Sequence, residues 1–311
     1  MTLHEDEIEI DLPLVRALVD RAVPELAGRR LRPLDASGSS NALFRLGEDL
    51  VVRLPRQPGG SETIGKEAHW LPYLTAALAV MIPEVVAVGE PALGYPERWS
   101  VVRWIDGSAP ELPSGASGAG GAAGKLVRDL AGVVAALGEL SVPPDALADP
   151  ALRWYRGEPL AALDATVRRY LADCRRLPDL DLDLGACLRV WEAAMTLTGT
   201  GDGVQVRWLH GDLLAENLLM SDGRLNAVLD FGGLAVGDPT VDLVVGWELL
   251  DPSGREEFKS LLDIDEVTWL RGRAWALVIA VMTFRYYSKT MPERCTARLA
   301  MARAVLADAR S

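Results

Sequence analysis

The sequence predicts an α+β fold in two lobes, because the kind of residue pattern changes along the chain. Residues 1–105 contain short apolar runs that are typical of strands, with one helical segment inserted among them. A stretch rich in Gly, Ala, Ser and Pro follows at 110–124, and such a composition favours a loop. The remaining residues are mostly helical in pattern. We therefore expect a small, β-rich N-terminal lobe at 1–105 and a larger helical lobe at 108–311.

The N-terminal lobe is predicted to be a small antiparallel sheet. A first helix is expected to open at Asp11, a residue type that often precedes a helix. Gly47-Glu48-Asp49 separates two apolar runs and indicates a hairpin turn. The expected strands are 31–34, 42–46, 50–54, 85–88 and 99–105, and the inserted helix is expected at 61–78.

The second lobe is predicted to be helical except for two short strands. These strands, at 204–209 and 225–229, flank a polar loop. The most apolar stretch, 275–284, is about half the length that a membrane span needs, so we interpret it as a buried helix. Helices are expected at 125–139, 160–176, 186–198, 239–250, 254–262, 266–288 and 293–309.

Composition narrows the range of partners and compartments. The chain has 311 residues and a net charge of −12, from 44 acidic against 32 basic side chains. This balance argues against a nucleic-acid binder and against docking on anionic lipid, and it weakly favours a cationic partner. The three cysteines form no CxxC pair, and the acidic N-terminus does not have the pattern of a signal peptide. We expect a cytoplasmic protein that works without zinc, nucleic acid or membrane.

The segment 206–243 carries the most informative chemistry. It contains His210-Gly211-Asp212, then Asn217, then Asp230-Phe231-Gly232. Phosphoryl transfer needs a carboxylate to orient or deprotonate the attacking hydroxyl, and oxygen ligands for magnesium. The turn at 221–224 would fold the second strand back and bring Asp230 near Asn217. We therefore predict Asp212 as the catalytic base, and Asn217 and Asp230 as magnesium ligands.

These motifs resemble those of a known enzyme family. HGDLLAENLL followed by VLDFGGLAVGDPTVDL resembles the catalytic and metal motifs of the aminoglycoside phosphotransferase family, which includes macrolide and hygromycin kinases. NALFRLG, VVRLPR, GWELL and RGRAWAL extend the resemblance over most of the chain. It implies a bilobal protein-kinase-like fold, with Mg²⁺, ATP or GTP as phosphate donor, and a small hydroxyl-bearing acceptor.

The resemblance also implies roles for single residues. Asp212 corresponds to the catalytic aspartate, and Asn217 and Asp230 correspond to the magnesium ligands. Asp242 is expected to hold the catalytic loop by hydrogen bonds. His210 is expected to serve packing and hydrogen bonding rather than chemistry. We interpret the later acids as structural rather than as ligands of a cationic substrate; these are Asp238, Glu248 and Asp251.

A kinase-like N-terminal lobe needs a cation for the phosphates, held by an acid on a helix. Arg53 closes a strand, and Glu67 follows on the next helix, so we expect an ion pair between them. Lys66, its neighbour, is expected to be solvated. The small residues Ser37, Gly38, Ser39 and Ser40 would let the backbone approach a triphosphate.

The last expected nucleotide contact is the connection between the lobes. The segment at about 102–107 resembles the family's hinge, whose backbone groups would contact the adenine or guanine base. The residues concerned are Val102, Arg103, Trp104 and Ile105.

Three functions fit these observations to different degrees. The first is an O-phosphotransferase that acts on an antibiotic of the aminoglycoside, macrolide or nucleoside type and so gives resistance. The second is a metabolic kinase for a sugar, a choline-like alcohol or an amino alcohol. The third is a catalytically degenerate kinase fold, which would have lost part of the catalytic set. Leu214-Ala215-Glu216 and Gly232-Gly233-Leu234 differ from the family's usual pattern, and they leave the acceptor open.

Overall fold

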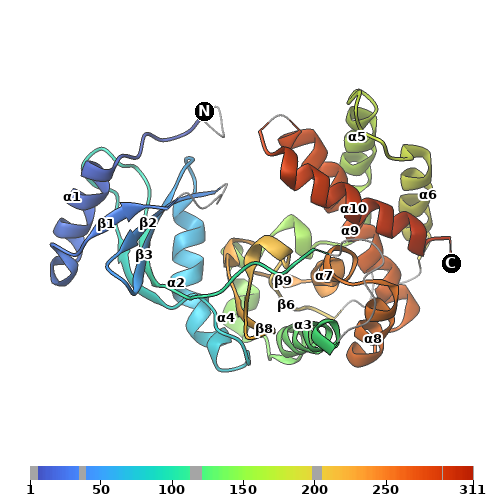
Figure 1. Cartoon of the computed structure of the whole chain (residues 1–311), viewed down its shortest axis with the longest axis horizontal. Helices are drawn as coiled ribbons and strands as arrows, with labels where there is room; N and C mark the ends of the chain where they lie inside the picture. Colours follow the sequence, from blue (N-terminus) through green and yellow to red (C-terminus); the bar gives the residue numbers. More distant parts are fainter. Residues whose placement is uncertain (1–5, 35–39, 113–120, 198–204, 289, 311) are drawn as a thin grey trace. The chain divides into compact units, whose positions relative to one another are not determined.

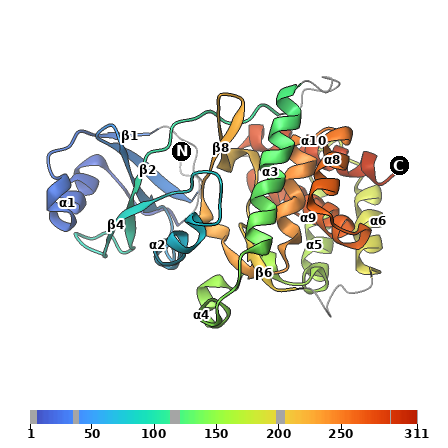
Figure 2. The ribbon, with the colours of Figure 1, turned by 90° about the horizontal axis from the view of Figure 1, so that it is seen from below.

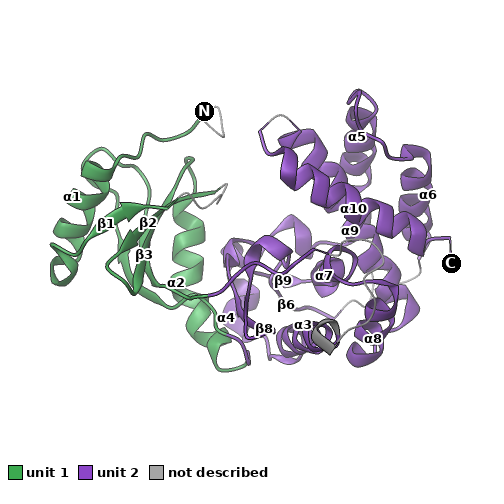
Figure 3. Cartoon of the chain, in the orientation of Figure 1, with its two compact units in different colours: residues 1–77, 81–106 green, residues 78–80, 107–311 purple. Residues whose placement is uncertain are grey.

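Figure 1 shows the computed structural model of the chain, which is divided into two compact units (Figure 3). Unit 1 comprises residues 1–77 and 81–106, and unit 2 comprises residues 78–80 and 107–311. The structure describes residues 6–34, 40–112, 121–197, 205–288 and 290–310. Each unit is described by itself below.

Unit 1 is a five-stranded antiparallel sheet with two α-helices (Figure 1). Asp11 caps the first helix by accepting a 2.8 Å hydrogen bond from the amide of Leu14. Gly47, with φ of +63°, makes the tight turn between β2 and β3. The strand order is β1-β2-β3-β5-β4. The elements are α1 (Leu12–Ala22), β1 (Leu31–Pro33), β2 (Asn41–Leu46), β3 (Leu50–Pro55), α2 (Ser61–Thr75), β4 (Val85–Gly89) and β5 (Trp99–Arg103).

The core of unit 1 forms between α1 and the sheet. Apolar residues at helical spacing on α1 pack with alternate residues of the strands. The Tyr95 hydroxyl closes the edge of this core by donating a 2.9 Å hydrogen bond to the carbonyl of Pro55. The most deeply buried members are Val15, Leu18, Val19, Leu46, Val52, Leu54, Trp99 and Val101.

Unit 2 is built around the long helix α9 (Figure 2). Its middle turns are buried all round, because α5, α6, α7 and α10 pack against it. α9 is long and apolar enough to cross a membrane, yet 72% of its most apolar window is buried inside the protein, as in a core helix. The α-helices are α3 (Gly121–Glu139), α4 (Pro144–Ala148), α5 (Asp164–Cys174), α6 (Leu184–Met195), α7 (Val245–Leu249), α8 (Pro252–Leu262), α9 (Glu266–Tyr287) and α10 (Pro292–Asp308).

Two small antiparallel ribbons frame the polar loop of unit 2. β6 (Arg207–Leu209) pairs with β9 (Ala235–Gly237), and β7 (Leu218–Ser221) pairs with β8 (Arg224–Val228). The β7–β8 turn is made by Asp222 and Gly223, both with positive φ, as a two-residue hairpin requires. The two strands expected from the sequence are therefore not partners of each other. Each pairs instead with a strand that was not predicted: β6 pairs with β9, and β8 pairs with β7.

Candidate active site

The loop at 210–217 leaves β6 and enters β7, and Asp242 anchors its beginning. Asp242 lies in the 3-10 helix η7 (Pro239–Val244), and its carboxylate accepts hydrogen bonds from the amides of His210 at 2.6 Å and Gly211 at 2.8 Å. Burial raises the pKa of Asp242 above its ordinary value, although these hydrogen bonds favour the ionised form. The predicted role of Asp242 as a holder of this loop is confirmed.

The end of the loop is held by two further elements. Glu248 on α7 accepts a 2.7 Å hydrogen bond from the amide of Ala215. Arg298 on α10 forms ion pairs with Glu248 and, at 2.6 Å, with Glu216 in the loop. The Arg298 and Glu248 side chains are almost fully buried. The loop is thus fixed at both ends by side chains that come from distant parts of the chain.

Asp212 is bound by an arginine, Arg156, to which no sequence pattern pointed. Arg156 donates to the Asp212 carboxylate and also, at 2.8 Å, to the carbonyl of Gly211. Burial disfavours the charged form of Asp212, but the adjacent Arg156 charge and its hydrogen bond keep the pKa of Asp212 below its ordinary value. Asp212 is therefore an ionised carboxylate with one oxygen held in place.

Local packing fixes the position of Arg156. It lies in a 3-10 turn, η3 (Tyr155–Gly157), which packs closely on β9. The carbonyl of Gly157 accepts a 2.8 Å hydrogen bond from the amide of Asp238, and a Cβ at Gly237 would lie only 2.3 Å from that carbonyl oxygen. The guanidinium lies 4.7 Å from the ring centroid of Trp154. The close approach of Gly157 and Gly237 is the one sequence feature that could have indicated the contact of Arg156 with Asp212, and these glycines are far apart in the chain.

Asn217 and Asp230 are brought together by the backbone. The amide of Leu229 donates a 2.7 Å hydrogen bond to the carbonyl of Asn217, so Asp230 follows directly at that point. The side-chain amide nitrogen of Asn217 donates to Asp212, at 2.8 Å to its carbonyl and 3.2 Å to its carboxylate. This orientation leaves the amide oxygen of Asn217 for another ligand.

The donor set fits magnesium better than zinc. Asp230 is left-handed, with φ of +56°, and one carboxylate oxygen accepts from the amide of Gly232 at 3.2 Å. Within the described residues, no three His, Cys, Asp or Glu side chains form a group that could hold a metal. One amide oxygen and one carboxylate are a small, hard donor set, which Mg²⁺ accepts when water and phosphate oxygens complete its shell.

His210 and Gly211 serve packing and backbone geometry. The His210 ring is fully buried and meets the Phe231 ring edge-on, with ring centroids 4.6 Å apart. Its Nδ1 accepts a 3.2 Å hydrogen bond from the amide of Asp212. Nε2 is then the protonated nitrogen, and it donates to the carbonyl of Leu229 at 3.0 Å. Gly211 has φ of +79°, and a Cβ there would lie 2.3 Å from the carbonyl oxygen of Gly233. The expected packing role of His210 agrees with these contacts.

The acids interpreted as structural cap or brace the fold. Asp238 accepts from the amide of Thr240 at 3.0 Å at the start of η7, and Asp251 accepts from Gly254 at 2.7 Å at the start of α8. Glu248 is the brace of the 210–217 loop described above. All three carboxylates therefore have partners within unit 2.

In unit 1, Arg53 and Glu67 form a buried, two-point ion pair. Nη1 of Arg53 lies 2.8 Å from one oxygen of Glu67, and Nη2 lies 3.2 Å from the other. The expected pair is present, with Arg53 on β3 and Glu67 on α2. Lys66 was expected in solvent, but its side chain is buried, with 7% exposure. Residues on more than one face of α2 are buried, and Lys66 is one of them.

The remaining predicted nucleotide contacts are only partly described. Ser37, Gly38 and Ser39 lie outside the described residues, while Ser40 is exposed and its carbonyl accepts from the amide of Arg56 at 2.9 Å.

The expected hinge segment already uses part of its backbone inside unit 1. Val102 is paired within the sheet. The amide of Arg103 donates a 3.0 Å hydrogen bond to the backbone carbonyl of Glu84. The amide of Trp104 donates a 2.8 Å hydrogen bond to the backbone carbonyl of Asp49. Within the described part of unit 1, Ile105 is the one expected hinge residue whose backbone makes no hydrogen bond to another residue.

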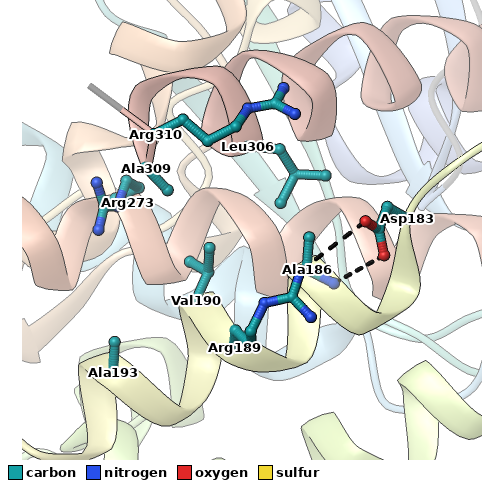
Figure 4. Close-up of a pocket in the computed structure, with 9 residues that line it drawn as sticks. All are labelled: Asp183, Ala186, Arg189, Val190, Ala193, Arg273, Leu306, Ala309 and Arg310. Carbon is teal, nitrogen blue, oxygen red and sulfur yellow. Dashed lines mark hydrogen bonds and ion pairs between the residues drawn. The ribbon is translucent and has the colours of Figure 1, made fainter.

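A cavity of about 240 Å³ lies elsewhere in unit 2 (Figure 4). It is lined by α6 with its preceding residue Asp183, by the end of α10 with the two residues after it, and by one residue of α9. Arg189, Arg273, Arg310 and Asp183 are its charged side chains, and the others are apolar. None of the predicted site residues lines it, so it is separate from the 210–217 loop.

Comparison with known proteins identifies the fold. Residues 31–275 match the model of the phosphotransferase enzyme family. A comparison with curated protein sequences finds no significant match.

Several solved structures are similar over nearly their whole length. The GDP complex of wild-type aminoglycoside 2'-phosphotransferase-IIIa is 19% identical with a TM-score of 0.68, over 96% of this chain and 100% of that one. The streptomycin–ATP ternary complex of APH(2")-IIa is 17% identical with a TM-score of 0.64, over 96% and 99%. Macrolide 2'-phosphotransferase MphH from Brachybacterium faecium is 24% identical with a TM-score of 0.61, over 94% and 98%. The kinase-like α+β fold expected from the sequence is confirmed.

Proposed function

Because the chain belongs to the phosphotransferase enzyme family, we propose that it transfers the γ-phosphoryl group of ATP or GTP to a hydroxyl of a small molecule, and that this molecule is an antibiotic. The observation that carries the proposal is the hydrogen-bonded arrangement of Asp212, Asn217 and Asp230 around one loop. Structures with this fold include complexes with GDP, and with ATP and streptomycin together. These complexes support a nucleotide donor and an antibiotic acceptor.

Asp212 orients the acceptor hydroxyl in this proposal. Arg156 holds one carboxylate oxygen, and a carboxylate has further lone pairs with which to accept the hydroxyl proton. The pKa of Asp212 is lowered, which makes it a weak base. That is sufficient here, because phosphoryl transfer has a loose transition state that depends mainly on alignment and charge stabilisation.

Asn217 and Asp230 hold Mg²⁺ through their side-chain oxygens. The ion, when bound, neutralises charge on the phosphate oxygens of the nucleotide. The residues' own task is to fix its ligands: the Asn217 amide is oriented by Asp212, and the Asp230 carboxylate by the turn that follows it. In unit 1, Arg53 contacts the phosphates of the nucleotide, and Glu67 holds the guanidinium of Arg53 in place.

The three cysteines agree with a reducing, cytoplasmic location, which is part of the proposal. All three are free. Burial raises the pKa of Cys174 to about 11 and that of Cys187 to about 12, so both thiols are unreactive at neutral pH.

A phosphate-transfer screen tests the proposed function. The purified protein is incubated with ATP or GTP, Mg²⁺ and a panel of antibiotics and small alcohols, and phosphorylated products are detected by mass spectrometry. We expect transfer to at least one antibiotic. Transfer only to a sugar, a choline-like alcohol or an amino alcohol would identify a metabolic kinase, and nucleotide binding without transfer would identify a binding module.

Asp230→Ala should abolish activity at ordinary magnesium concentrations or make it require much more magnesium, because a charged oxygen ligand is lost. Asn217→Ala should have the same effect more weakly, since a neutral amide binds the ion less strongly. Magnesium titrations of kcat check both variants, with Asp222→Ala in the nearby hairpin turn as the control. An unchanged magnesium dependence in Asp230→Ala would show that it is not a ligand.

Arg53 and Glu67 should behave as one unit in nucleotide binding. Arg53→Ala should weaken nucleotide affinity and lower turnover, and Arg53→Lys should keep part of the activity, because the charge remains but the two-point contact is lost. Glu67→Ala should be milder, because its role is to orient Arg53. A double-mutant cycle on nucleotide affinity checks this pairing. Fully additive losses would mean that the two residues act independently.

A further inference from the structure

Three carboxylates at the 210–217 loop already have arginine partners within the chain. Asp212 is paired with Arg156. Glu216 is paired with Arg298 at 2.6 Å and lies 3.5 Å from Arg294, while Glu248 is paired with Arg298. A polycationic acceptor would have to compete with these arginines for the carboxylates.

Burial makes that competition unfavourable. The Arg298 side chain is 2% exposed and the Arg156 side chain 9%, so neither can turn into solvent to free its carboxylate. Displacing a buried guanidinium would also leave an unpaired charge in the interior, which costs far more than an exposed ion pair returns. The negative net charge of the whole chain therefore does not make these three carboxylates available to a polycation.

A tyrosine surface begins directly beside Asp212. Nε of Arg156 donates to the hydroxyl of Tyr155 at 2.9 Å, and that hydroxyl lies 3.4 Å from the sulfur of Met282 on α9. Tyr170 on α5 and Tyr286 on α9 meet edge-on, with ring centroids 6.3 Å apart. We call Tyr155, Tyr170 and Tyr286 the tyrosine surface; Tyr286 is its exposed member, and Tyr170 is buried beside it.

The three tyrosines are neighbours rather than separate features. Met282, which the Tyr155 hydroxyl contacts, lies one helical turn before Tyr286 on α9, so the two side chains share a face of that helix. Tyr286 is 58% exposed, an unusual amount for a large aromatic side chain. An exposed aromatic ring that is linked to Asp212 through Met282, Tyr155 and Arg156 is suited to the apolar face of a ligand.

The charges beside the tyrosine surface are paired as well. Arg285 lies over the rings of Tyr170 and Tyr286, at 5.4 and 5.3 Å, and its Nε lies 2.9 Å from Asp173. Asp164, also on α5, is paired with Arg168 at 3.0 Å. The carboxylates of Asp173 and Asp164 are therefore also occupied by arginines.

We propose that the acceptor is a hydroxyl-bearing molecule with a broad apolar face and at most one positive charge, which packs on the tyrosine surface and presents its hydroxyl to Asp212. The inference rests on the proposed function and narrows its substrate class. Polycations of the aminoglycoside type are poor acceptors, although structures with this fold include aminoglycoside complexes.

Calorimetric titration at two salt concentrations tests the charge argument. The probes are erythromycin and chloramphenicol, which carry one charge and none, and kanamycin, a polycation; Mg²⁺ and a non-hydrolysable nucleotide are present throughout. We expect at least one of the first two to bind at least about tenfold more tightly than kanamycin. Its Kd should change less than about twofold between about 50 and 300 mM salt, because ion pairing contributes little. Tighter binding of kanamycin, or no binding of either apolar probe, overturns the proposal.

Substitution of Tyr286 tests the surface itself. Tyr286→Ala should raise KM for the bound probe, or its Kd if the probe is not phosphorylated, at least about tenfold while kcat stays within about twofold. Tyr286→Phe should retain the affinity, because the ring remains. Leu261→Ala, another exposed apolar residue on α8 with 47% exposure, is the matched control. An unchanged KM or Kd in Tyr286→Ala overturns the proposal.

Failure of this inference differs from failure of the proposed function. If polycations are phosphorylated with a KM that rises steeply with salt, the phosphotransferase function stands and the assigned acceptor class is wrong. If the protein neither binds nucleotide nor transfers phosphate, the proposed function is wrong, and the preference among probes is still decided by calorimetry without nucleotide.

Discussion

Asp212→Asn should lower kcat at least about a hundredfold, the scale expected for a lost base and positioning group. The amide has nearly the shape of the carboxylate but cannot accept the hydroxyl proton, and it forms a weaker contact with Arg156. Asp212→Ala should lower kcat at least as much. Steady-state kinetics on the substrate found in the transfer screen measures the effect, and circular dichroism shows whether the fold is kept.

The matched control is Asp222→Asn. Asp222 is an exposed acid in the β7–β8 turn, and its left-handed conformation, with φ of +51°, is one that asparagine adopts readily. This variant makes the same chemical change nearby and should leave kcat unaltered. Near-normal turnover in Asp212→Asn would show that Asp212 is not the catalytic residue.

The motif residues could be predicted from the sequence because they act within one short segment. Asp212, Asn217, Asp230 and Asp242 all lie in the segment from the end of β6 through η7, and the backbone that joins them folds locally. The pairing of Arg53 with Glu67 was also predictable, because a strand and the next helix bring them together over 14 residues.

Arg156 and Arg298 could not be predicted in the same way. Their partners in the loop, Asp212 and Glu216, lie 56 and 82 positions away in sequence. The packing of η3 on β9 and of α10 on α9 decides which of the many arginines reaches the loop. No local sequence pattern predicts such packing. The strands β7 and β9, of four and three residues, were missed as well.

The largest effect on stability is expected at Arg298. Arg298→Met keeps an unbranched side chain of similar length but leaves Glu248, which is 5% exposed, without its cationic partner. Breaking a buried pair by removing one member costs about 3–5 kcal/mol of unfolding free energy. Urea denaturation measures this loss, and adding Glu248→Gln to the variant should restore part of it, because the unpaired charge is gone.

Arg303→Met is the matched control for Arg298→Met. Arg303 lies on the same helix, and its side chain is 52% exposed and paired with the exposed Asp181. Losing such a surface pair costs at most about 1 kcal/mol. Equal losses in the two variants would mean that the buried Arg298 network contributes no more to stability than a surface ion pair does.

The cost of Arg298→Met should also depend on pH, and the burial of Glu248 fixes the direction. Burial raises the pKa of Glu248 above its ordinary value, while the Arg298 charge opposes that rise. Without Arg298 the pKa of Glu248 rises further, so the folded state binds its proton more tightly than the unfolded chain does. Stability of the variant is then greatest at low pH and falls as pH rises from the unfolded pKa, about 4.3, through the folded one. The difference in unfolding free energy from the unsubstituted protein should therefore be larger at about pH 7.5 than at about pH 5. A difference that is the same at both values would mean that Glu248 stays ionised when Arg298 is gone, with another partner in place of the arginine.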